Sequence, residues 1–71
     1  MKIYTQDRKR IIEMPREIWV AEMSINGEIY STAYINAHLG TYNNIDRAKE
    51  VVKEIFDYHR NGKNSYIMPE Q

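Results

Sequence analysis

The chain has 71 residues, ten of them basic and ten acidic, so its formal net charge is zero and no global field draws it to nucleic acid or to a membrane surface. It contains no cysteine, which excludes disulfides, thiol chemistry and cysteine-ligated zinc, and no apolar run approaches the roughly 20 residues of a membrane-spanning helix. We expect one domain over residues 1–71, and the lack of a signal-peptide pattern at the N-terminus favours a cytoplasmic location.

The first predicted element is a hairpin. Residues 2–6 and 10–14 are β-prone and flank the polar segment Asp7-Arg8-Lys9, and Pro15 ends the second strand because it lacks a backbone donor. Charge is uneven here, since residues 2–16 hold five basic and two acidic side chains. Such a run is usually a solvated turn, but it also supplies candidate nucleic-acid contacts, namely Arg8, Lys9, Arg10 and Arg16.

A second hairpin is predicted over residues 18–35. Asn26-Gly27 suits a two-residue type I′ turn, which pairs Met23 with Tyr30 and Trp19 with Tyr34. Because side chains alternate along a strand, one face then carries aliphatic residues, namely Ile18, Val20, Ile29, Ala33 and Ile35. The opposite face carries the candidate partner-binding residues Trp19, Met23, Tyr30 and Tyr34.

One helix follows a short extended segment over residues 39–42. Asn43 is the expected N-cap, and Gly62 suits the left-handed residue after the helix. Between them an apolar stripe recurs at helical spacing and ends in a partly buried histidine: Ala48, Val51, Val52, Ile55 and His59. Residues 65–68 are predicted to form a last strand, closed by Pro69.

This order predicts an α+β domain, a mostly antiparallel sheet of two N-terminal hairpins and a C-terminal strand with one helix packed on one face. We expect the helix to cover the aliphatic face of the second hairpin. A single helix covers a single sheet face, so the aromatic face is expected to be covered by something outside the chain.

Residues 39–69 resemble small uncharacterised proteins of phages and mobile elements of Gram-positive bacteria. The shared features are an L-G-x-Y segment, an R-A helix start, a V-V-x-E-I helix body and a Y-x-M-P ending, here Leu39, Gly40, Tyr42, Arg47, Ala48, Val51, Val52, Glu54, Ile55, Tyr66, Met68 and Pro69. The resemblance implies a phage or prophage context and no catalytic activity. Phage proteins of this size often bind a host component, which favours a binding role by association.

The residues themselves offer little for catalysis. His38 and His59 are the only groups with ordinary pKa values near 7, and no nucleophile, phosphate-loop or metal-ligand spacing accompanies them. We therefore predict no catalytic, cofactor or metal site and no small-molecule substrate. The sequence favours a non-enzymatic module that binds a protein partner or itself through the aromatic face. The alternative is a single-stranded nucleic-acid-binding protein that uses the same face and the Arg8-Lys9-Arg10 patch.

Overall fold

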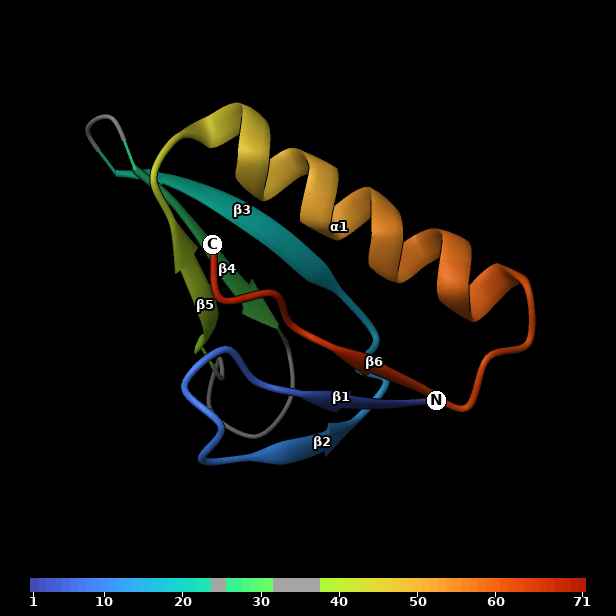
Figure 1. Ribbon diagram of the computed structural model, residues 1–71. Helices are drawn as coiled ribbons and strands as arrows, with labels where there is room; N and C mark the ends of the chain where they lie inside the picture. Colours follow the sequence, from blue (N-terminus) through green and yellow to red (C-terminus); the bar gives the residue numbers. More distant parts are fainter. Residues whose placement is uncertain (24–25, 32–37) are drawn as a thin grey trace.

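The computed structural model describes residues 1–23, 26–31 and 38–71 (Figure 1). It confirms the α+β class with one helix, and its strands form two three-stranded sheets rather than a single sheet. The terminal sheet has the order β2-β1-β6 and the central sheet has the order β3-β4-β5. The elements are β1 (Lys2–Tyr4), β2 (Ile11–Glu13), β3 (Ile18–Met23), β4 (Asn26–Ser31), β5 (His38–Tyr42), α1 (Ile45–Arg60) and β6 (Ser65–Ile67).

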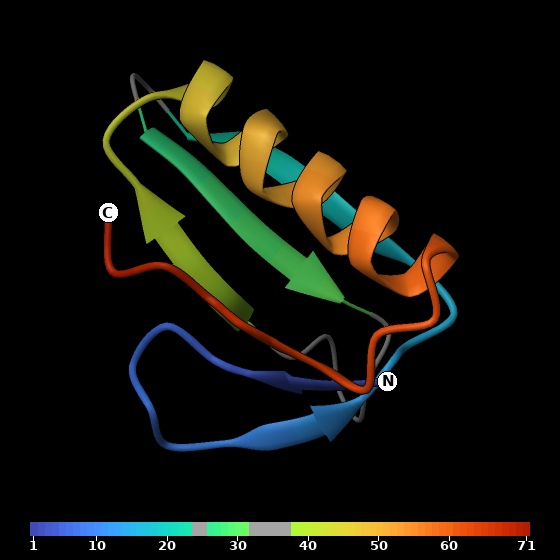
Figure 2. The ribbon, with the colours of Figure 1, turned by 45° about the vertical axis from the view of Figure 1, so that its right-hand side comes forward.

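Helix α1 covers one face of the central sheet and lies along β3 and β4 (Figure 2). Ile29 of β4 is fully buried on this face, and Ile18 and Val20 of β3 pack against the same core. The helix contributes Ala48, Val51 and Ile55 to that core. The prediction that the apolar stripe packs on the aliphatic face is confirmed for these residues, while Ala33 and Ile35 lie outside the described residues.

The predicted turn at Asn26-Gly27 is wrong. Both residues belong to β4, where Asn26 pairs with Met23 and Gly27 with Glu22, so neither of them forms the turn. A Cβ atom on Gly27 would lie 2.5 Å from the Cβ of Ala48 and 3.2 Å from the Asn44 carbonyl oxygen. Glycine therefore lets α1 approach the strand closely, and this tertiary requirement overrides the local turn preference.

The strand register is consequently shifted. Trp19 pairs with Tyr30, not with Tyr34, and Met23 does not pair with Tyr30. The partner of Trp19 has moved by four residues, an even number, so every described side chain stays on its predicted face.

Two boundaries next to the helix also differ from expectation. The extended segment before the helix is a full strand, β5, which pairs antiparallel with β4 through a bulge at Ile29/Tyr30. The N-cap is Asn44 rather than Asn43, and its side-chain oxygen accepts a 2.7 Å hydrogen bond from the backbone N–H of Arg47. The end of the helix is confirmed, with Gly62 at a φ of 74°.

His59 is exposed and not partly buried, so the buried stripe stops one turn before it. The neighbouring Tyr58 packs edge-on against Tyr66 of β6, with 4.9 Å between ring centroids. The last turn of α1 thus directs Tyr58, not His59, towards β6.

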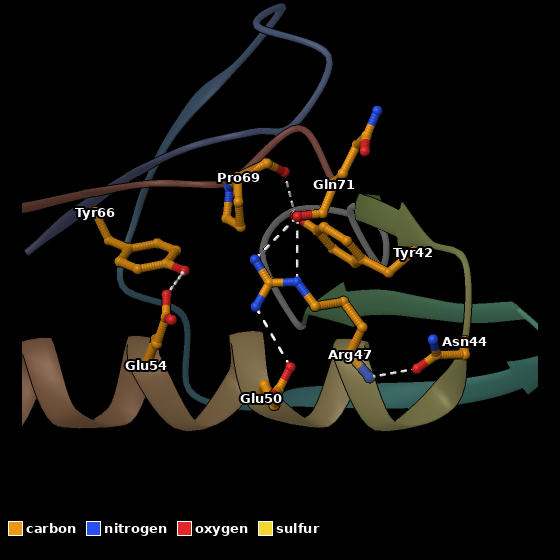
Figure 3. Close-up of polar contacts among 8 residues, drawn as sticks. All are labelled: Tyr42, Asn44, Arg47, Glu50, Glu54, Tyr66, Pro69 and Gln71. Carbon is orange, nitrogen blue, oxygen red and sulfur yellow. Dashed lines mark hydrogen bonds and ion pairs between the residues drawn. The ribbon is translucent and has the colours of Figure 1, made fainter.

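The terminal sheet joins the two ends of the described chain. β1 runs antiparallel to β2 and parallel to β6, so the buried side chains Ile12, Ile3 and Tyr66 lie in one row. Figure 3 shows the segment after β6 held against β5 and α1. The Tyr42 hydroxyl donates a 2.7 Å hydrogen bond to the carbonyl oxygen of Pro69, and Arg47 donates two to the carbonyl oxygen of Gln71.

Gln6 connects the two sheets. Its backbone N–H donates to the Leu39 carbonyl oxygen at 2.9 Å, and its side-chain amide exchanges hydrogen bonds with the backbone of Thr41 at 2.9 and 2.7 Å. Gln6 thereby occupies the outer edge of β5 and brings the β1–β2 turn beside it.

Candidate interaction surface

Three rings lie side by side across the face of the central sheet that α1 leaves uncovered. Trp19 of β3 stacks on Tyr30 of β4 with 6.1 Å between ring centroids, and Tyr30 meets His38 of β5 at 5.1 Å. Trp19 is 37% exposed, Tyr30 is half-buried and His38 is exposed. We call Trp19, Tyr30 and His38 the aromatic row. The strand register accounts for this row, because Trp19 lies directly opposite Tyr30 and Tyr30 lies directly opposite His38.

A polar cluster closes the His38 end of the row. The Nε2 atom of His38 lies 3.0 Å from the Thr41 hydroxyl and 3.4 Å from the Glu28 carboxylate. Glu28 and Thr41 are directly opposed on β4 and β5, so the sheet register brings the three side chains together. The imidazole is held in place at the row's end, and the half-buried Glu28 gives this end a negative charge.

Asp7 adds a second carboxylate near this end of the row. Hydrogen bonds from the Lys9 backbone N–H and the Thr5 hydroxyl hold the pKa of Asp7 below its usual value, and His38 adds a smaller attraction. The Asp7 side chain is exposed, and with its lowered pKa the carboxylate is ionised at neutral pH. Glu28 thus places a carboxylate in direct contact with the His38 end of the row, and Asp7 acts on His38 more weakly.

The predicted basic residues are divided between two places. Arg8, Lys9 and Arg10 gather with Tyr4 and Ile11 around a hollow of about 240 Å³ beside the terminal sheet. Arg16 lines a different groove, next to α1.

Arg8 serves the fold itself. Its guanidinium donates to the carbonyl oxygens of Thr5 at 2.8 Å and Met68 at 2.9 Å, and it lies 5.3 Å from the ring centroid of Tyr4. Arg8 also has a φ of 63°, a left-handed conformation that is uncommon for a residue other than glycine. The Arg8 guanidinium therefore links the β1–β2 turn to the segment after β6 through hydrogen bonds.

The structure brings together two of the four predicted partner-binding residues, Trp19 and Tyr30. Tyr34 lies outside the described residues, as does the side chain of Met23, although Met23 itself is part of β3. The sequence did not point to His38, Glu28 and Thr41, because residues 39–42 were predicted only as a short extended segment leading into the helix, with no partner strand assigned. The signal that could have found them is the β-prone stretch at residues 39–42, because an extended segment in a small domain needs a strand to pair with.

No family model, curated protein or solved structure matches this chain. Over residues 1–23, 26–31 and 38–71, no group of three or more histidine, aspartate or glutamate side chains is placed to hold a metal ion. In the same part of the chain, no helix has the length and apolar character required to cross a bilayer.

Proposed function

We propose that this chain is a non-enzymatic interaction module that binds a protein partner through the aromatic row, and that the partner presents a basic segment. The observation that supports the proposal is an exposed row of rings with two carboxylates, Glu28 and Asp7, at one end. Tryptophan and tyrosine are the residue types that most often carry binding energy at interfaces.

The chemistry of the row favours a cationic ligand. An arginine or lysine over the face of a tryptophan or tyrosine ring gains about 0.5–2 kcal/mol, with tryptophan the best acceptor. A guanidinium on the row would also be within the field of Glu28, whose half-buried position reduces screening by solvent. A basic segment laid across the strands from Trp19 to His38 satisfies both interactions.

Single-stranded nucleic acid is the alternative ligand, since it also stacks on rings. It needs a positive groove along its backbone. Here the charged group in contact with the row is the Glu28 carboxylate, 3.4 Å from His38, and the Arg8 guanidinium is bound to backbone carbonyl oxygens. A phage or prophage origin, which the resemblance implies, is compatible with a protein target.

The single tryptophan of the chain makes the proposal directly measurable, because Trp19 belongs to the row and no other tryptophan contributes to the emission. We expect a decapeptide of alternating arginine and glycine to change the emission saturably, and the binding to weaken with salt. Tyr30→Ser and Glu28→Gln should each weaken binding by about tenfold, which corresponds to about 1.4 kcal/mol. Ile11→Ser is the matched control, because Ile11 is an exposed apolar residue on the terminal sheet.

Two results would contradict the proposal. The first is no saturable response to the arginine peptide. The second is tighter binding of an oligothymidylate than of the peptide, with loss of that binding in a Lys9→Ala, Arg10→Ala double variant. That second result would support the nucleic-acid alternative.

A further inference from the structure

The outer edge of β3 differs from the other sheet edges of the described chain. The outer edge of β5 is occupied by Gln6 and interrupted by a bulge, and β2 and β6 are only three residues long. By contrast β3 has six residues, IWVAEM, with neither proline nor lysine, and its one strand neighbour in the described chain is β4. Proteins ordinarily shorten, charge or cover such an edge, because its free backbone groups pair readily with another strand.

An apolar groove runs beside this edge on the α1 side of the sheet. It has a volume of about 180 Å³, and Met14, Ile18, Val52 and Phe56 line it. Phe56 is 59% exposed although it is among the largest apolar side chains of the protein. A strand added to β3 would bring further side chains against this groove, and a strand with its own helix would cover Phe56 as well.

We propose that β3 pairs antiparallel with β3 of a second copy of this chain, with the two-fold axis at Trp19. Pairing a strand with itself in this way keeps its faces, so both helices lie on one side of a six-stranded sheet and both aromatic rows lie on the other. The groove beside each β3 then faces the partner's helix across the junction.

The strand's own sequence selects a second copy as the occupant. With Trp19 opposite Trp19 of the second copy, Ile18 comes opposite Val20 and Glu17 opposite Ala21, so no like charges meet. Moving the axis to Ile18 sets Glu17 opposite Trp19, and moving it to Val20 sets Ile18 opposite Glu22. The segment is therefore most complementary to itself with the axis at Trp19.

Cysteine cross-linking tests this register, because the chain has no cysteine of its own. Directly opposed residues of antiparallel strands have Cα atoms about 4.5–5.5 Å apart, within the range of a disulfide. We expect a mixture of Glu17→Cys and Ala21→Cys chains to form a cross-linked heterodimer under mild oxidation. Neither variant alone should cross-link, because the two identical positions are then about 14 Å apart along the strands.

Sedimentation equilibrium provides the second measurement. The wild-type chain should sediment with twice the mass of one chain, and Phe56→Ser should raise the dimer dissociation constant by at least about tenfold. Ile67→Ser is the matched control, because Ile67 is similarly exposed on the terminal sheet, away from β3. A monomeric wild-type chain, or an Ala21→Cys chain that cross-links with itself as readily as in the mixture, would overturn the pairing.

This inference does not rest on the proposed basic partner. Phe56 lies on the α1 side of the central sheet and the aromatic row on the other, so Phe56→Ser leaves the three residues of each row in place, and a monomeric variant should still bind the arginine peptide. A wild-type chain that is monomeric but binds the peptide shows that the pairing has failed, and a wild-type dimer that does not bind the peptide shows that the proposed function has failed.

Discussion

At the scale of single residues, Gly27 is the position where the structure most clearly requires glycine. Adding a methyl group there places it 2.5 Å from the Ala48 Cβ, which requires α1 or β4 to move. We expect Gly27→Ala to lower the free energy of unfolding by about 1–3 kcal/mol in urea denaturation.

The second half of this test is a double-mutant cycle with Ala48→Gly. That change alone costs about 1 kcal/mol, because glycine is a poor helix former. In the Gly27→Ala background it should cost less, since it removes the closest clashing atom. Strictly additive effects, or a Gly27→Ala chain as stable as wild type, would mean that the close approach of strand and helix has no energetic consequence.

Asp7 is the residue from which a pH dependence follows. Its carboxylate accepts hydrogen bonds from the Lys9 N–H and the Thr5 hydroxyl, and these lower its pKa in the folded state from the usual 3.8. Because the pKa of Asp7 is lower in the folded state, its carboxylate contributes to the free energy of unfolding, and this contribution is fully present above pH 3.8. That contribution is lost as the pH falls through the folded-state value.

We therefore expect the wild-type free energy of unfolding to fall more steeply below about pH 4 than that of Asp7→Asn. Urea denaturation between pH 7 and pH 2 measures both slopes. Glu70→Gln, which removes an exposed carboxyl group elsewhere, serves as the control. Parallel curves for wild type and Asp7→Asn would show that the turn does not depend on this carboxylate.

At the scale of elements, α1 is the part that the sequence predicts best. Its caps and its 3.6-residue periodicity are local signals, so its start was predicted to within one residue. The position of the β3–β4 turn could not be found in the same way, because the reason for Gly27 is a helix some twenty residues later. β5 was likewise recognised as extended but not as a paired strand, since its partner depends on the true register of β4.

The packing of α1 leads to a graded prediction. Ile55 is fully buried, whereas Val52 is only half-buried at the groove beside β3. Ile55→Ala should lower the free energy of unfolding by about 2–4 kcal/mol, and Val52→Ala by less than half of that amount. Chemical denaturation of both variants at one protein concentration tests the ranking. Equal losses would be inconsistent with a helix whose buried face is centred on Val51 and Ile55.

At the scale of the whole molecule, the α+β class was predictable from the order of strand-like and helical segments. The division into two sheets was not, because it depends on β1 pairing with β6 across the length of the chain. The same distinction holds for the candidate surface. Trp19 and Tyr30 follow from strand alternation, which an even register shift preserves. His38, Glu28 and Thr41 join them only through the bulge and the pairing of β5.

The parallel pairing of β1 with β6 also has a kinetic consequence. Lys2 lies opposite Ser65, so this contact closes a loop of about sixty residues, and the entropy of closure must be met before the contact forms. The central sheet and α1, by contrast, are assembled from one continuous stretch of chain with short connections. We infer that the central sheet and its helix form first during folding and that β6 docks on β1 last. Until that step, the backbone groups along the β1 edge of the first hairpin have no partner strand. During unfolding the order is reversed, and β6 separates from β1 first.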